Sequence, residues 1–340
     1  NALLLNTTAS NNTAVGYAAL DAATTGGNNT AVGTNALGAN TTGTVSTAVG
    51  RWSLAAQTTG SGNTAVGETS LQNLTTSVSN VAVGNNALGD ITTGVGQNVG
   101  IGRYAGMVLT TGTSNVFNGY YSAPTATTAS NNVGLGANAL QALTTGGQNT
   151  AVGQGALDAA TTVDGITAIG HACLSALTTG VENQGFGHYA GAAVTTGTAN
   201  TLIGHRAGVA ITTATTNTII GKTAGDAITT SSGNICIGVD AGPDITTAGA
   251  GGNAYIGNYS GTGQLTGYRN VGVGSTSCQG TGNYNVAVGY DAFSNNGLGN
   301  QNTCIGDAAG NSVTGSNNAC LGYDADNSSD YQSNEFTLGN

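Results

Sequence analysis

A segment of about seventeen residues repeats along the whole chain. Residues 11–27 read NNTAVGYAALDAATTGG, and residues 28–44 read NNTAVGTNALGANTTGT. One glycine per repeat marks the period, and fifteen of the nineteen steps between these twenty marker glycines are 17 residues long. A strict period of this length without a helical pattern is typical of a solenoid of short strands. We therefore expect an all-β fold, a parallel β-solenoid or β-roll with one coil per repeat.

Positions within a repeat are counted here from its marker glycine. The marker glycines are Gly16, Gly33, Gly50, Gly67, Gly84, Gly102, Gly119, Gly136, Gly153, Gly170, Gly187, Gly204, Gly221, Gly238, Gly257, Gly274, Gly289, Gly306, Gly322 and Gly339. Position −1 is large and apolar in nineteen of twenty repeats, as at Val15 and Val32, and the exception is Asn118. Position −3 is usually Thr, Val or Ile, and β-branched residues favour strands. Positions −3 to −1 should form a strand whose position −2, often Ala, faces the opposite side.

The residues at positions −2 and +4 vary inversely in size from repeat to repeat. Early repeats combine Ala at −2 with Leu at +4, whereas a later repeat combines Leu202 with Gly208. Close packing keeps the filled volume nearly constant, so these two columns should touch. The repeat with Gly100 and Gly106 is small at both positions and does not follow this rule.

Two polar columns predict hydrogen-bonded ladders. Position −4 is Asn in seventeen of twenty repeats, beginning with Asn12 and Asn29, and stacked amides can bond along such a column. A Thr-Thr pair recurs fifteen times, from Thr7 and Thr8 to Thr246 and Thr247, and predicts a second ladder. The marker glycine should permit a tight turn or a close backbone approach.

Both sides of the predicted strand are apolar, although a thin coil has only one interior. The second apolar column, the one of Ala, Gly and Leu, is therefore assigned to contact with copies of the same chain. The pattern alone leaves open which column faces the chain's own interior. We expect an elongated homotrimeric fibre. Residues 1–247 carry the regular repeat, and residues 248–340 continue it less regularly toward a C-terminal domain expected beyond them.

Composition excludes several classes of partner. Charged residues are only 6% of the chain, the net charge is −10, and the five cations form no basic stripe. Nucleic acid and anionic membrane surfaces are therefore not expected as partners. Membrane insertion is not expected either, because no apolar run approaches the roughly 18 residues that a membrane span needs.

The five cysteines show neither a zinc motif nor an even count for a disulfide framework. We interpret them as small buried residues. The alternative is a bond between neighbouring coils or chains at Cys304 and Cys320.

The motif NTAVGxxAL resembles the head repeats of trimeric autotransporter adhesins. That resemblance implies trimers of parallel β-rolls that bind surfaces. The last eight residues, SNEFTLGN (Ser333 to Asn340), look like the segment ahead of the endosialidase-type self-cleaving chaperone domain of bacteriophage and algal-virus tail fibres. In that family the chaperone domain trimerises the fibre and is then cut away.

These resemblances imply a structural fibre shaft, on a virion surface or extracellular, that reaches a host-cell surface glycan or protein. A bacterial extracellular adhesin or filament that binds glycans is the alternative. A third hypothesis is an ice-binding solenoid, since regular Thr ranks can order water, but adjacent Thr residues point to opposite faces of a strand.

Aromatic residues collect at position +2. They are Trp52, Tyr104, Tyr121, Tyr189 and Tyr259. Exposed rings among Asn and Thr groups suit carbohydrate faces, so this column is a candidate glycan-binding surface. The alternative role is packing between chains at their rim.

Two groups of residues are candidate metal ligands. His171, His188 and His205 occupy position +1 of consecutive repeats and form either a metal or anion site or a solvated ladder. The segment DADNSSDYQSNE resembles a calcium loop through Asp324, Asp326, Asp330 and Glu335, but its sixth residue is Ser329 instead of Gly, which favours a polar turn. Beyond these possible metals no cofactor is expected. The repeat supplies no nucleophile or carboxylate at a fixed reach for acid–base work, so we do not expect an enzyme.

Overall fold

The computed structural model describes residues 1–340 except 95, 247–250, 264–265, 295–297, 328–331 and 340. It contains twenty strands of three residues, and each strand ends directly before a marker glycine. The chain divides into two compact units, residues 1–166 and 167–340. In the described residues there is no helix that could cross a membrane.

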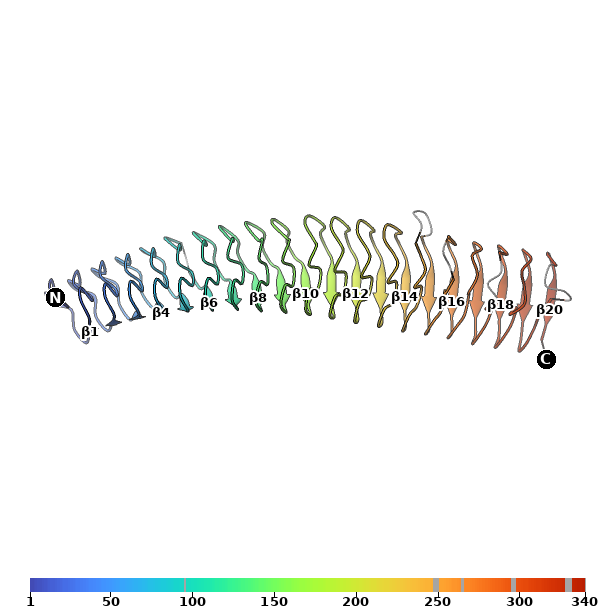
Figure 1. The fold of residues 1–340 in the computed structure, drawn as a ribbon, viewed down its shortest axis with the longest axis horizontal. Coiled ribbons are helices and arrows are strands. Elements are labelled where there is room, and N and C mark those ends of the chain that lie inside the picture. The colour runs from blue at the N-terminus through green and yellow to red at the C-terminus, as the bar shows by residue number, and fades with distance from the viewer. Residues whose placement is uncertain (95, 247–250, 264–265, 295–297, 328–331, 340) are drawn as a thin grey trace. The chain divides into compact units, whose positions relative to one another are not determined.

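The first unit contains nine strands. They are β1 (Thr13–Val15), β2 (Thr30–Val32), β3 (Thr47–Val49), β4 (Thr64–Val66), β5 (Val81–Val83), β6 (Val99–Ile101), β7 (Val116–Asn118), β8 (Val133–Leu135) and β9 (Thr150–Val152). Each strand pairs in parallel with the next along the chain, as Thr13 of β1 does with Thr30 of β2 (Figure 1). This arrangement confirms the expected solenoid of about 17-residue coils.

The second unit contains eleven strands. They are β10 (Thr167–Ile169), β11 (Gln184–Phe186), β12 (Thr201–Ile203), β13 (Thr218–Ile220), β14 (Ile235–Ile237), β15 (Ala254–Ile256), β16 (Val271–Val273), β17 (Val286–Val288), β18 (Thr303–Ile305), β19 (Ala319–Leu321) and β20 (Phe336–Leu338). Irregular steps do not disturb the pairing: Ile235 pairs with Ala254, and Val271 pairs with Val286. The strands after residue 247 thus keep the same parallel register as those before it. The predicted boundary itself, at residues 247 and 248, lies outside the described residues.

The interior of each coil is lined by position −2 together with the small residue at +3 and the apolar residue at +4. In the second coil, Ala31, Ala36 and Leu37 are completely buried, whereas Val32 at position −1 remains 36% exposed. The assignment of the Ala, Gly and Leu column to a partner chain was therefore wrong. The small residues face the chain's own interior because the bulky Leu across the coil fills the space, and the Val and Ile column, including Val15, faces outward.

The predicted contact between positions −2 and +4 is confirmed. A Cβ atom added at Gly208 would lie 2.9 Å from Cδ2 of Leu202, and one added at Gly261 would lie 2.5 Å from the ring of Tyr255. In these two coils, glycine at +4 leaves room for the large residue at −2.

The Gly100 and Gly106 repeat is explained by its neighbours. A Cβ atom at Gly100 would lie 2.6 Å from Cγ of Leu88, which belongs to the preceding coil. One at Gly106 would lie 2.7 Å from Leu88 Cδ2 and 2.8 Å from Phe117 Cδ2, which belongs to the following coil. Two large side chains from adjacent coils thus fill the space that this coil leaves, so volume is balanced across three coils.

The asparagine ladder forms as predicted. The Nδ2 of Asn29 donates to the carbonyl oxygen of Gly43 at 2.9 Å, and its Oδ1 accepts the N–H of Ser46 at 2.9 Å. Asn12 accepts the N–H of Asn29 in the same way, at 2.9 Å. Each amide therefore joins its own coil to the next and satisfies backbone groups that are buried.

The threonine ladder bonds to the backbone. The Oγ1 of Thr41, the first member of its pair, donates to the carbonyl oxygen of Thr58 at 3.1 Å. The second member, Thr42, is exposed.

The marker glycines serve both expected purposes. Gly16 has φ 129° and Gly33 has φ 137°, a region that residues with a Cβ atom avoid. A Cβ atom at Gly33 would also lie 2.4 Å from the carbonyl oxygen of Gly50. Neighbouring coils thus approach each other at a corner where no side chain fits.

Candidate functional site

The corner after each strand places positions +1 and +2 on the outside of the coil. Trp52 at +2 has φ 62°, and its backbone N–H donates to the carbonyl oxygen of Thr34 in the preceding coil at 2.9 Å. Positive φ is uncommon for an aromatic residue, and the ladder of backbone bonds holds it there. All five aromatic residues predicted to form a binding column have this backbone conformation.

The predicted aromatic column does not form one continuous surface. Tyr104 and Tyr121 lie on adjacent coils with ring centroids 5.0 Å apart, and Arg103 lies over the Tyr104 ring at 4.6 Å. Trp52 lies nearer the N-terminus of the first unit, separated from Tyr104 by two coils that carry Thr69 and Asn86 at +2. Tyr104 and Tyr121 thus pack on each other, and Tyr104 also packs on the arginine; both tyrosines are half-buried.

The other two aromatic residues belong to the second unit. Tyr189 packs edge-on against His188, with ring centroids 4.2 Å apart, and against His171 at 5.2 Å. Tyr259 is 49% exposed.

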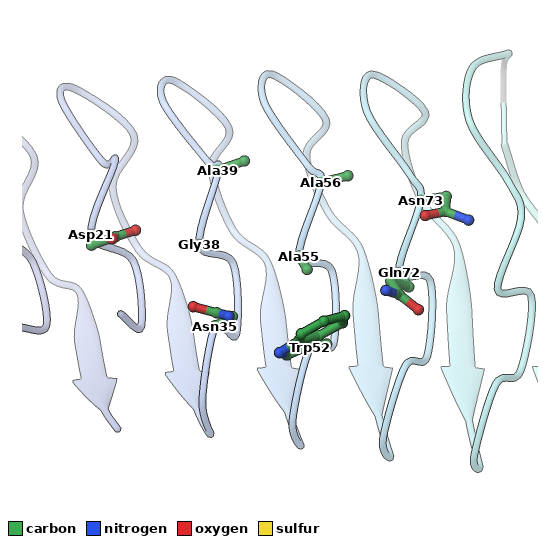
Figure 2. Close-up of a pocket in the computed structure, with 9 residues that line it drawn as sticks. All are labelled: Asp21, Asn35, Gly38, Ala39, Trp52, Ala55, Ala56, Gln72 and Asn73. Carbon is green, nitrogen blue, oxygen red and sulfur yellow. The ribbon is translucent and has the colours of Figure 1, made fainter. Parts of the chain in front are cut away.

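A hollow of about 390 Å³ lies beside Trp52 (Figure 2). It is lined by Asp21, Asn35, Gly38, Ala39, Trp52, Ala55, Ala56, Gln72 and Asn73. These residues come from four consecutive coils and occupy only positions +2, +5 and +6. Sequence reasoning identified Trp52 but not the other residues. The available signal was a pair of adjacent repeats with only Gly and Ala at +5 and +6, between Asp21 at +5 of the repeat before and Gln72 and Asn73 of the repeat after.

The three histidines stack instead of converging. The ring centroids of His171 and His188 are 5.0 Å apart with planes at 30°, and those of His188 and His205 are 5.3 Å apart with planes at 12°. A zinc ion requires ring nitrogens that meet about 2.0–2.1 Å from one point, which near-parallel stacked rings do not provide. Loss of hydration, and then the charges of its two neighbours, lower the pKa of His188 below its ordinary value.

The acidic residues near the C-terminus have separate roles. Asp326 accepts hydrogen bonds from the N–H and the hydroxyl of Ser312. Glu335 occupies position −4 of the last repeat, where its N–H donates to Oδ1 of Asn318 at 2.9 Å. Asp324 is exposed, and Asp330 lies outside the described residues. In the part of the chain that the structure describes, no three His, Cys, Asp or Glu side chains form a group that could hold a metal ion.

The cysteines are buried thiols, as predicted. Cys304 and Cys320 are register neighbours on β18 and β19 and remain free. The hydrogen bond with Cys320, together with burial, raises the pKa of Cys304 far above its ordinary value. Burial alone raises the pKa of Cys236 to about 12. Cys304 and Cys236 therefore stay protonated and act as small apolar side chains of the interior.

No protein-family model matches the chain, and no curated protein matches it in sequence.

Proposed function

We propose that this chain is a segment of a structural fibre, built from three parallel copies that pack through the outward face of their strands. The observation that supports this proposal is the outward ladder at position −1. Val32, Val49 and Val66 are 36%, 36% and 37% exposed, and Val, Ile or Leu continues the ladder in later coils of both units. Within each unit, in-register pairing makes this ladder an apolar strip, which Asn118 interrupts once in the first unit.

The strip carries no charge. None of the twenty described strands contains Asp, Glu, Lys or Arg. Monomeric proteins rarely expose contiguous apolar patches larger than a few hundred Å², and larger patches are typical of interaction surfaces. A row of Val and Ile that extends over many coils favours burial against a partner.

Copies of the same chain are the simplest partner for such a strip. A partner must offer an apolar ladder with the same spacing, and an identical chain in register does so with the same residues. The number three and the role as the shaft of a viral or phage fibre come from the resemblance of NTAVGxxAL and SNEFTLGN to fibre and adhesin segments.

The mass of the chain in solution tests this proposal. We expect the purified chain to sediment with the mass of three chains. The double variant Val49→Asp, Val66→Asp, which buries two carboxylates in the proposed interface, should sediment as a monomer with its β-structure retained. The matched control Thr42→Asp, Thr59→Asp adds the same charge at exposed positions on another edge and should remain a trimer.

Two results would contradict the proposal. A parent chain that sediments as a single chain at every concentration would mean that the outward strip has no partner of its own kind. A parent chain that sediments with the mass of two chains would be consistent with the interface but would refute threefold packing.

Ice binding receives less support. In the described pairs the second threonine, such as Thr42 or Thr59, is exposed, but in most of them the hydroxyl of the first donates to a backbone carbonyl, as Thr41 does. Among these described pairs, only one row of free threonine hydroxyls therefore faces solvent, and one row orders water over a narrower area than two parallel rows would.

A further inference from the structure

The hollow beside Trp52 exists because two adjacent coils carry the smallest residues at positions +5 and +6. These are Gly38 and Ala39 in one coil and Ala55 and Ala56 in the next. The preceding coil carries Asp21 at +5, and the following coil carries Gln72 and Asn73 at +5 and +6, so these residues close the two ends of the trough (Figure 2). We propose that this trough is a binding site for an uncharged saccharide.

Trp52 forms the aromatic wall of the trough. Trp52 is the only tryptophan of the chain and is 42% exposed. The guanidinium of Arg51 lies over the ring, 5.7 Å from its centroid, and is itself held by an ion pair with Glu68. The backbone bond to the preceding coil fixes the corner that carries the indole. The ring is thus held in place while a large apolar surface remains in contact with solvent.

Polar side chains surround this ring without internal partners. In the described part of the chain, no hydrogen bond to another protein group involves the side chains of Asp21, Asn35 or Gln72. Asn73 differs, because its Nδ2 donates to Oδ1 of Asp90 at 2.9 Å. In Figure 2 the amide of Asn35 lies on the coil before Trp52, and Gln72 lies on the coil after it. Donors and acceptors are therefore available on both sides of the aromatic ring.

This combination selects a class of ligand. A sugar ring has an apolar C–H face for the indole and hydroxyls that both donate and accept, as the amides of Asn35 and Gln72 do. The volume of about 390 Å³ is that of a small-ligand pocket. Asp21 contributes a negative charge, and Arg51 is neutralised by Glu68, so an anionic ligand is disfavoured.

The site lies within four coils of one chain. Its occupation therefore does not depend on the number of chains in the fibre, and the two proposals can fail separately.

Fluorescence of the single tryptophan tests the site directly. The full chain is titrated with lactose, maltose and N,N′-diacetylchitobiose up to about 100 mM, since one shallow site is expected to bind in the millimolar range. Sorbitol, an open-chain polyol, is the control for hydroxyl groups without a ring face. We expect a saturable change of Trp52 emission with at least one disaccharide and none with sorbitol.

Variants that fill the trough separate this site from other surfaces. Ala55→Gln and Ala56→Asn copy the residues that the next coil already carries at +5 and +6, so both fit the fold. Each should weaken binding at least tenfold and leave the circular dichroism spectrum unchanged. Ala176→Asn makes the same change at +6 in a coil of the second unit and should leave the affinity unchanged.

Two outcomes would overturn the proposal. One is the absence of a saturable response to all three disaccharides. The other is a response that survives both trough-filling substitutions, because the ligand would then bind elsewhere.

Discussion

Replacing Asn132 by Ala should open the solenoid locally, because this residue joins three coils. Its Nδ2 donates to the carbonyl oxygen of Gly146 at 3.0 Å and to Oδ1 of Asn115 at 3.1 Å. Its Oδ1 accepts the N–H of Asn149 at 3.0 Å and the Nδ2 of Asn149 at 3.1 Å. Asn132 is completely buried, so water does not replace these bonds.

The size of the effect follows from which groups lose their partners. Nδ2 of Asn149 keeps its bond to the carbonyl oxygen of Val163 at 2.7 Å, and Oδ1 of Asn115 keeps the backbone N–H of residue 132 at 3.0 Å. The N–H of Asn149 and the carbonyl oxygen of Gly146 each lose the bond described above. A buried unsatisfied group costs about 1–3 kcal/mol, with the carbonyl at the low end, so the substitution should cost about 2–4 kcal/mol.

Hydrogen exchange followed by mass spectrometry is the appropriate assay, because coils of a repeat protein open locally. A cost of about 2–4 kcal/mol corresponds to exchange that is roughly 30- to 1,000-fold faster in the coils around residues 132 and 149. The control Asn131→Gly changes the adjacent, exposed asparagine, whose φ of 61° suits glycine, and should alter exchange little. Equal exchange in both variants would refute the claim that the buried ladder holds neighbouring coils together.

Three further predictions concern backbone, thiols and pH. Gly50 has φ +134°, and a Cβ atom there would lie 2.5 Å from a carbonyl oxygen, whereas Gly165 has φ +70° and no atom near its Cβ position. Gly50→Ala should therefore lower the free energy of unfolding by about 3 kcal/mol or more and Gly165→Ala by about 1 kcal/mol; equal shifts of the urea midpoint would contradict this. Burial raises the pKa of Cys173 and Cys236 to about 12, so a maleimide at pH 8 should label them only after denaturation, and rapid labelling of the folded chain would count against burial. Since the pKa of His188 is lowered, the folded state disfavours its protonation, and stability should decline as pH falls through the ordinary value of 6.5; an NMR titration midpoint at or above 6.5 would contradict the stacked ladder.

The period of the sequence was sufficient to predict the strands, the asparagine ladder and the contact between positions −2 and +4. Each of these depends on residues that recur at a fixed place in every coil, such as Asn29 before the strand and Gly33 after it. In a stacked solenoid, recurrence along the chain becomes contact in space, so a column can be predicted from one sequence.

Tertiary structure decided which side of the strand is the interior. Ala31 and Val32 are both apolar, and strand alternation separates them without saying which one faces inward. The coil encloses Ala31 because Leu37 crosses the interior and fills it, which leaves the larger Val32 outside. Hydrophobicity alone would favour the opposite choice, since burial of Val contributes more than burial of Ala.

Tertiary structure also decided the features that depend on differences between coils. Positions 100 and 106 carry glycine because Leu88 and Phe117 from the two adjacent coils occupy the space that a side chain would need. The trough beside Trp52 likewise requires four successive coils to place small residues between larger ones. A repeat determines by itself what all coils share, whereas packing between unlike neighbours, which is set by volume in three dimensions, determines where one coil differs from the next.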